Sequence, residues 1–190
     1  MKVLGISGSL RGDSHNTKLL RTASELLPPD VDLELWDGLK AVPPYDEDDD
    51  VQPAPAAVAA LREAIADADA VLFATPEYNW SIPGVLKNAI DWVSRPLATN
   101  PLRNTPVAVI GASTGAFGAV WSQAELRKVL SATGARVLED EVAVGHAHTR
   151  FDEEGRLVDG ELREQLGEVL AALLGEVAAR SPAPTLVATA

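Results

Sequence analysis

The sequence contains no cysteine, and this absence excludes several kinds of protein. Without thiols the chain has no disulfide framework, no cysteine nucleophile and no cysteine-ligated zinc or iron–sulfur site. Its three histidines are too few for a histidine-rich metal site. If the protein carries out redox chemistry, a bound cofactor must therefore supply it.

Long apolar runs are also missing. No run approaches the roughly 20 residues that a membrane-spanning helix needs. The apolar part of the N-terminus is too short for a secretory signal and leads directly into a strand pattern. The 46% of hydrophobic residues excludes a disordered or collagen-like chain. We therefore expect a soluble, cytoplasmic protein that does not act at a membrane.

Basic residues are scarce relative to acidic ones. The 190 residues include 16 Lys and Arg against 28 Asp and Glu, which gives a net charge of −12. A general nucleic-acid binder needs a basic face, so no nucleic-acid partner is expected. The consecutive carboxylates at 46–50 repel one another and predict a solvated loop. The alternative for this run is a site for a hard cation, which prefers clustered oxygens.

The chain does contain a regular alternation of short apolar runs and segments with helical periodicity. Strands are expected at 3–7, 31–36, 70–75, 107–112 and 136–144. Helices are expected at 16–27, 58–68, 83–93, 120–132 and 161–179.

This alternation defines the expected fold class. Buried strands separated by helices predict an α/β protein, with a parallel sheet covered on both faces. Right-handed crossovers restrict it to a doubly wound sheet. Five strands fit the flavodoxin-like order 2-1-3-4-5 better than a six-stranded dinucleotide fold. We expect one domain over residues 1–180 and a flexible tail at 181–190.

Three loops follow strands at the edge of the sheet where ligands bind in such folds. The first joins a strand to a helix N-terminus, which attracts phosphate through free N–H groups and partial positive charge. Ser9, Ser14, Asn16 and Thr17 add small hydrogen-bonding groups, and Arg11 adds a forked cation. Helix capping by Ser14 or Asn16 is the alternative, but it does not require Arg11. The loop therefore favours an anion site.

The other two loops suit a flat ligand. Residues 76–81 combine a rigid proline with two aromatic side chains, Tyr78 and Trp80, which favours contact with a heterocycle. A turn packed on its own domain or on a partner subunit is the alternative. Glycines in residues 113–118 allow the backbone to approach a ligand closely, although a tight turn has the same composition. Glu77 is a candidate general base, but a lone glutamate in a turn is usually solvated.

Two motifs resemble those of the NADPH-dependent FMN reductase family, which includes chromate-, quinone- and azo-dye-reducing flavoproteins. The first is Gly8-Ser9-Leu10-Arg11 followed by Ser14 and Asn16. The second is longer and more specific, and it runs from Thr75-Pro76-Glu77-Tyr78-Asn79 through Pro83-Gly84 to Lys87-Asn88-Ala89-Ile90-Asp91-Trp92. The resemblance covers roughly residues 1–175. Ala119 departs from the pattern, because the family often has a second glycine after Gly118.

The resemblance implies a cofactor and the residues that hold it. The FMN phosphate would be held by Ser9, Arg11, Ser14, His15, Asn16 and Thr17. The isoalloxazine ring would be bordered, largely through backbone groups, by Pro76, Glu77, Tyr78 and Asn79. Ser113 and Gly115 would approach its pyrimidine side. No catalytic side chain and no metal ligand is implied, because the flavin carries the chemistry.

The function expected on these grounds is an NAD(P)H-dependent FMN oxidoreductase. Hydride would pass from NADPH or NADH to the flavin, and a small-molecule acceptor such as a quinone, azo compound, metal oxyanion or flavin would then be reduced in a ping-pong cycle. A homodimer or homotetramer is expected, as in the family. The alternative is a flavodoxin-type electron carrier without NAD(P)H activity, although its usual Thr-Gly-x-Thr loop is missing. A colourless binding module that takes up no FMN also remains open. His146 and His148 are expected to have surface or interface roles.

Overall fold

A parallel β-sheet forms the centre of the protein, whose structure is a computed structural model that describes residues 1–179. The strands are β1 (Lys2–Ser7), β2 (Asp32–Trp36), β3 (Ala70–Thr75), β4 (Pro106–Ala112), β5 (Arg136–Val137) and β6 (Ala143–Val144). Their order is β2-β1-β3-β4-β5, with β6 also beside β4. This order confirms the predicted doubly wound, flavodoxin-like sheet. The tail expected at 181–190 lies outside the described residues.

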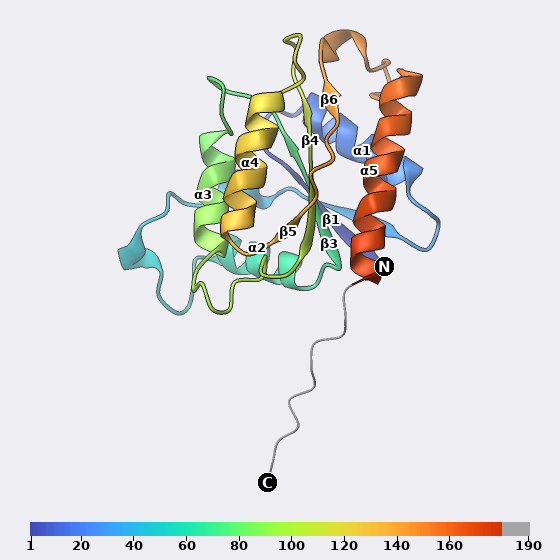
Figure 1. Cartoon of the computed structure of the whole chain (residues 1–190). Helices are drawn as coiled ribbons and strands as arrows, with labels where there is room; N and C mark the ends of the chain where they lie inside the picture. Colours follow the sequence, from blue (N-terminus) through green and yellow to red (C-terminus); the bar gives the residue numbers. More distant parts are fainter. Residues whose placement is uncertain (180–190) are drawn as a thin grey trace.

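Helices cover both faces of the sheet, as Figure 1 shows. One face is covered by α1 (His15–Leu26) and α5 (Gly160–Ala178), and the other by α2 (Ala56–Ala66), α3 (Gly84–Val93) and α4 (Val120–Ala132). The alternation of side chains along β3 explains the two layers. Leu72 packs with α1 and α5, whereas Phe73 packs with α2, α3 and α4.

The last predicted strand is divided in two, which differs from the expectation for 136–144. β5 pairs with the beginning of β4 and β6 pairs with its end. The carboxylates at 139–141 lie between them and are exposed. A charged side chain is costly to bury without a partner, so these residues leave the ladder. Glu141 is paired at the surface with Arg127 of α4.

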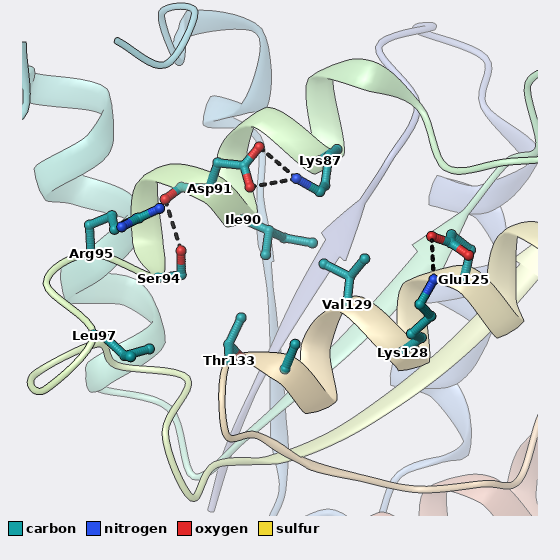
Figure 2. Close-up of a pocket in the computed structure, with 11 residues that line it drawn as sticks. Lys87, Ile90, Asp91, Ser94, Arg95, Leu97, Glu125, Lys128, Val129 and Thr133 are labelled. Atoms are coloured by element: carbon teal, nitrogen blue, oxygen red, sulfur yellow. Dashed lines mark hydrogen bonds and ion pairs between the residues drawn. The ribbon is translucent and has the colours of Figure 1, made fainter. Parts of the chain in front are cut away.

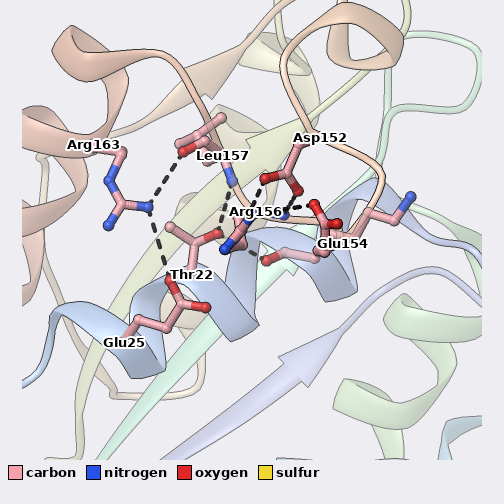
Figure 3. A network of polar contacts seen from close by, with 8 residues as sticks. Thr22, Glu25, Asp152, Glu154, Arg156, Leu157 and Arg163 are labelled. Atoms are coloured by element: carbon pink, nitrogen blue, oxygen red, sulfur yellow. Dashed lines mark hydrogen bonds and ion pairs between the residues drawn. The ribbon is translucent and has the colours of Figure 1, made fainter.

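A dense polar network attaches the segment before α5 to α1, as Figure 3 shows. The Thr22 hydroxyl of α1 accepts a hydrogen bond from the Leu157 N–H at 3.3 Å. Arg163 donates to the Leu157 carbonyl at 3.2 Å and lies 3.9 Å from Glu25. Arg156 pairs with both Asp152 and Glu154. We call residues 152–163 the paired segment, because its cations all have acidic partners.

The acidic run at 46–50 forms a short 3₁₀ turn, η2 (Glu47–Asp49), on the surface. Its last carboxylate, Asp50, pairs with Arg62 of α2 at 3.1 Å. Within residues 1–179, no group of three or more His, Cys, Asp or Glu side chains is arranged to hold a metal ion. In the same range, no helix is long and apolar enough to cross a membrane.

Candidate functional site

A cavity of about 150 Å³ lies where three loops meet, beyond the carboxyl ends of β1, β3 and β4. We number these loops after the strands that they follow, as the first (8–14), third (76–83) and fourth (113–119) loops. We call this cavity the loop cavity. It is lined by Ser9, Arg11, Ser14, His15, Asn16, Pro76, Glu77, Tyr78, Ala112, Ser113 and Thr114. Of the residues named from the sequence, Thr17, Asn79 and Gly115 are absent from this lining within the described chain. Ala112 and Thr114 line it without having been singled out.

The N-terminus of α1 provides one wall of the loop cavity. Ser14 is its N-cap, and the serine hydroxyl accepts a hydrogen bond from the Thr17 N–H at 3.3 Å. Among residues 1–179, the backbone N–H groups of His15 and Asn16 have no acceptor. Such free N–H groups, together with the helix dipole, form a ready site for an anion.

Arg11 brings a positive charge to the same wall. Its guanidinium donates to the Asp13 carbonyl at 3.1 Å, and in the described chain no carboxylate lies within ion-pair distance of it. The Asp13 carboxylate is instead paired with Lys18 at 2.5 Å, and this hydrogen bond lowers the pKa of Asp13. Arg11 is therefore held over the cavity with its charge available to a ligand.

His15 has a more protected position than a loop residue usually has. Its ring stacks on Phe151 with centroids 5.6 Å apart, and its Nδ1 is buried with no hydrogen-bond partner in the described chain. Burial, with help from Lys18 and Arg11, lowers the pKa of His15 below its ordinary value of 6.5. This environment favours the neutral imidazole, because a protonated ring needs acceptors for two N–H groups.

The Asn16 side chain is committed to the fold rather than to a ligand. Its Nδ2 donates to the Ala112 carbonyl at 3.0 Å, and its Oδ1 accepts from the Ala112 N–H at 2.9 Å. These two bonds join the first turn of α1 to the end of β4. Thr17 is likewise turned inward, where its hydroxyl donates to Ser7 at 3.0 Å. Asn16 thus retains only its backbone N–H for an anion.

Glu77 is fixed by helix α4. Its Oε2 accepts hydrogen bonds from the backbone N–H groups of Trp121 and Ser122, both at 3.1 Å. The N-cap position of α4 is Ala119, which has no side-chain oxygen to offer, so Glu77 supplies the cap from another loop. This contact explains why the glutamate occurs there, and it places the third loop against the fourth.

Residues 78–81 form a tight turn at the rim of the loop cavity. The N–H and carbonyl groups of Tyr78 and Ser81 bond reciprocally at 3.0 and 3.2 Å. Asn79 and Trp80 between them have positive φ angles of 52° and 65°. The Tyr78 ring is held half exposed at the rim.

An aromatic cluster lies beside this turn. The Trp80 ring contacts the Trp121 ring edge to face at 4.2 Å, and Phe117 contacts Trp121 at 5.0 Å. All three side chains are exposed large hydrophobic groups. Sequence reasoning singled out Trp80 for its ring, but it considered the loop that holds Phe117 only for its glycines and did not consider Trp121 of α4.

The fourth loop is pressed against β6, which explains its glycines. At Gly118 φ is +60°, and a Cβ there would lie 2.3 Å from the Ala143 carbonyl carbon. The carbonyl of Gly115 accepts from the His146 N–H at 2.9 Å, so His146 positions the loop through its backbone. Ala119 also has a left-handed φ of 65°, which accounts for the glycine that the family often carries there.

Figure 2 shows a larger groove, about 420 Å³, between α3 and α4. Two of its three cations are paired, since Lys87 contacts Asp91 at 2.6 Å and Lys128 lies 3.5 Å from Glu125, whereas Arg95 has no ion pair within the described residues. None of its lining residues belongs to the three loops. The loop cavity is therefore the better candidate site.

The loop cavity fits the cofactor that the sequence motifs imply. An unpaired guanidinium and two free N–H groups at one end match a phosphate. Proline, an exposed tyrosine and a backbone held at close approach at the other end match a flat ring. A buried, unpartnered His15 Nδ1 in the lining marks a polar position that the protein itself leaves unsatisfied.

Comparisons with known proteins agree with this reading. The model of the NADPH-dependent FMN reductase family matches residues 1–149. The chain is 47% identical over 174 residues to an NAD(P)H-dependent FMN reductase from Pseudomonas aeruginosa, covering 91% of this chain and 93% of the relative. It is 38% identical to a 2-hydroxy-1,4-benzoquinone reductase from a Burkholderia species, covering 87% and 90% of the two chains.

A solved structure with the same architecture is FerB, a flavoenzyme NAD(P)H:(acceptor) oxidoreductase from Paracoccus denitrificans. It has a TM-score of 0.84 and 34% identity, and the match covers 94% of this chain and 97% of FerB. A flavodoxin from Pseudomonas aeruginosa, at 19% identity and a TM-score of 0.59, shares the fold. On the strength of the family model, the curated relatives and the loop cavity together, this chain belongs to the NADPH-dependent FMN reductase family of FMN-containing oxidoreductases.

Proposed function

We propose that the protein reduces small quinones with electrons from NADPH or NADH, in a ping-pong cycle at the loop cavity. The observation that carries this proposal is the polarity of that cavity, with an unpaired cation and free N–H groups at one end and an exposed aromatic rim at the other. When bound, FMN supplies the redox chemistry by accepting hydride from the nicotinamide and passing the electrons to the acceptor.

The residues of the first loop anchor the phosphate. Arg11 offers a forked, charge-assisted contact, and the N–H groups of His15 and Asn16 offer two further donors. Ser9 lines the same cavity. These groups bind and orient the phosphate but take no part in proton transfer.

The third and fourth loops position the ring. Glu77 ties the two loops together through α4, so the backbone at Pro76, Tyr78 and Ser113 is held in place before a ligand arrives. Pre-organised backbone groups stabilise a bound ring without an ordering cost at each turnover. No side chain in this set needs to act as a catalytic acid or base.

The acceptor is a planar molecule that replaces the nicotinamide at the same exposed face. Tyr78 and the aromatic cluster of Trp80, Phe117 and Trp121 provide ring surfaces there. Relatives named 2-hydroxy-1,4-benzoquinone reductase and quinone reductase support a quinone over an azo compound or a metal oxyanion.

Two further parts of the proposal concern the context of the enzyme. A homodimer or homotetramer would cover exposed hydrophobic side chains outside the site, such as Leu97 and Val158. A cytoplasmic location would supply the reduced pyridine nucleotide.

One experiment tests the proposal directly. The purified protein is loaded with FMN and mixed anaerobically with NADPH or NADH, and the visible flavin absorbance is followed. Bleaching within seconds, followed by reoxidation on addition of a benzoquinone, is expected. Parallel double-reciprocal plots at several quinone concentrations would establish the ping-pong order. Flavin that stays oxidised with both nucleotides would instead identify an electron carrier, and a protein that takes up no FMN would overturn both readings.

A further inference from the structure

A second cavity, of about 430 Å³, lies beside the loop cavity at the carboxyl ends of β1 and β2. We call it the β2 cavity. Its walls come from the first loop, one side of α1, the end of β2 and the turn η1 (Gly38–Ala41). Ser9 and Arg11 line both cavities. Its volume is in the range of small-molecule sites.

The β2 cavity gathers basic side chains that no carboxylate neutralises. Within residues 1–179, the Lys and Arg side chains outside every ion pair are Arg11, Arg21, Lys40, Arg95 and Arg103. Arg11, Arg21 and Lys40 all line this one cavity, and Asp37 is its single carboxylate. Because Arg11 is assigned to the FMN phosphate, Arg21 and Lys40 against Asp37 leave one positive charge in excess. In a protein with a net charge of −12, such a local excess indicates an anionic ligand.

The same cavity has an aromatic wall. Trp36, at the end of β2, is half-buried and lines the cavity beside the apolar side chains of Leu35 and Leu39. Its ring lies against Gly38, where a Cβ would come within 2.5 Å of a ring carbon. The absence of a side chain at Gly38 thus lets the indole rest on the backbone. A flat apolar surface next to cations is the chemistry that recognises a nucleotide.

The two cavities are connected by a third space. This third cavity, about 390 Å³, is lined by Leu10, Arg11 and Tyr78 together with residues of the α3 N-terminus. Tyr78 also lines the loop cavity, and Leu10 also lines the β2 cavity. A ligand can therefore extend from the rim at Tyr78, past Arg11, to Trp36. From β3 to β2 this path crosses two strand spacings, about 10 Å.

From these observations we infer that the β2 cavity binds the adenosine 2′-phosphate end of NADPH, with Arg21 and Lys40 on the 2′-phosphate and Trp36 beside the adenine. The nicotinamide end then reaches the rim at Tyr78. In doubly wound dinucleotide folds, too, a basic residue near the second strand accommodates the 2′-phosphate. This inference rests on the proposed use of NAD(P)H, and it adds a preference for NADPH over NADH.

Asp37 provides a second test of the inference, because its carboxylate would repel the same phosphate. It immediately follows β2 and lines the cavity with Arg21 and Lys40. Replacing it by asparagine removes a like charge, whereas replacing either cation by alanine removes an attractive one. The asparagine variant of Asp37 and the alanine variants of Arg21 or Lys40 should therefore change phosphate binding in opposite directions.

Calorimetric titration of the FMN-loaded protein tests the site without turnover. The probes are adenosine 2′,5′-bisphosphate and adenosine 5′-monophosphate, which differ in the 2′-phosphate. We expect the bisphosphate to bind about 10-fold more tightly, and Arg21→Ala/Lys40→Ala to abolish that advantage. Asp37→Asn should strengthen bisphosphate binding. Arg103→Ala is the matched control, since it removes an unpaired cation near Gly134, at the opposite edge of the sheet.

Steady-state kinetics give a second readout. The ratio of kcat/KM for NADPH to kcat/KM for NADH should fall about 10-fold in Arg21→Ala/Lys40→Ala and stay unchanged in Arg103→Ala. Equal binding of the two probes, or a ratio that the double variant leaves unchanged, would overturn the inference while NAD(P)H oxidation still supported the proposed function. A different outcome is that the wild-type protein oxidises neither nucleotide but still prefers the bisphosphate, and that the double variant loses this preference. That result would support the site and overturn the proposed function.

Discussion

Two regions of the molecule use their cations differently. One is the paired segment at 152–163, and the other is the sheet edge at β1, α1 and β2, which we call the open rim. In the paired segment, Arg156 and Arg163 have carboxylate partners, and the segment is bonded to α1 through Thr22 (Figure 3). At the open rim, Arg21 and Lys40 have no such partner within the described chain. A cation that is already satisfied organises the fold, whereas one left open is available to a ligand.

The contrast leads to a simple expectation about mutations. Changes to groups that are satisfied inside the protein should alter its stability and leave ligand binding alone. Changes to groups left open should do the reverse. Asn16 is a useful case because it lies at the open rim, yet both of its amide groups are satisfied by Ala112.

Asn16→Ala should have the largest effect, on stability. The substitution leaves the N–H and carbonyl of Ala112 buried without partners, and each such loss costs about 1–3 kcal/mol. We expect the free energy of unfolding of the flavin-free protein to fall by about 2–4 kcal/mol in urea denaturation. Asn16→Asp is the control, because it keeps the acceptor for the Ala112 N–H and should lose less. Equal stability of Asn16→Ala and the wild type would show that the contact contributes nothing.

Arg11→Ala should have the opposite effect to Asn16→Ala, because it should weaken ligand binding and leave stability nearly unchanged. Loss of a charge-assisted contact to the FMN phosphate is expected to weaken FMN binding by about 1–3 kcal/mol. The unfolding of the flavin-free protein should be nearly unchanged, because Arg11 has no carboxylate partner in the described chain. Fluorescence titration of the flavin-free protein measures the affinity, and Arg11→Lys separates charge from fork geometry. Wild-type affinity in Arg11→Ala would remove Arg11 from the phosphate site.

Glu77→Ala tests a residue that the sequence presented as a candidate base. Because Glu77 caps α4, its removal should lower the free energy of unfolding by about 1 kcal/mol. Glu77→Gln retains an acceptor oxygen and should recover most of that loss. In both variants the rate of flavin reduction by NADPH should stay within a few-fold of wild type. A profile of that rate against pH that loses an ionisation in Glu77→Gln would instead identify acid–base catalysis.

His15 should make stability depend on pH. Because burial lowers its pKa in the folded protein, the unfolded chain binds more protons just below pH 6.5. The contribution of His15 is therefore complete above pH 6.5 and is lost as the pH falls toward the folded-state pKa. Proton NMR titration should show the midpoint of His15 below 6.5, and His15→Gln should remove that signal. A His15 midpoint at or above 6.5 would contradict the burial.

Arg156→Ala should have the smallest effect, although Arg156 makes the most ionic contacts in the paired segment. Exposed ion pairs contribute little, because water and salt screen them. We expect no change in FMN affinity and a change in unfolding too small to resolve beside that of Asn16→Ala. A fall in FMN affinity in Arg156→Ala would contradict the expectation that the paired segment does not affect ligand binding.

Much of the fold was predictable, because burial and periodicity are local signals. The alternation of apolar strands and amphipathic helices led to the strand order β2-β1-β3-β4-β5, which the structure confirms. The exception was the segment 136–144, where the charged residues 139–141 interrupt the ladder. Its periodicity indicated a strand, but the cost of burying the carboxylates decided against an unbroken one.

The convergence of the three loops was also predictable, since the carboxyl ends of parallel strands meet at one edge. The sequence did not show which atoms are free to bind a ligand. Asn16 and Thr17 looked like phosphate ligands by residue type, but their side chains are bonded to Ala112 and Ser7. Phe151, which stacks on His15, had no signal in the sequence at all.

The sequence by itself determined the fold class, the family and the three loops, because these depend on residue type and on spacing over a few residues. The tertiary structure decided the role of each polar group, because a hydrogen bond depends on which partner lies within about 3 Å. Asn16 meets Ala112 across 96 positions of the chain, and Glu77 caps a helix that begins more than 40 residues later. Among residues 1–179, the same long-range pairing left Arg21 and Lys40 without acidic partners beside Trp36, which no local pattern specifies.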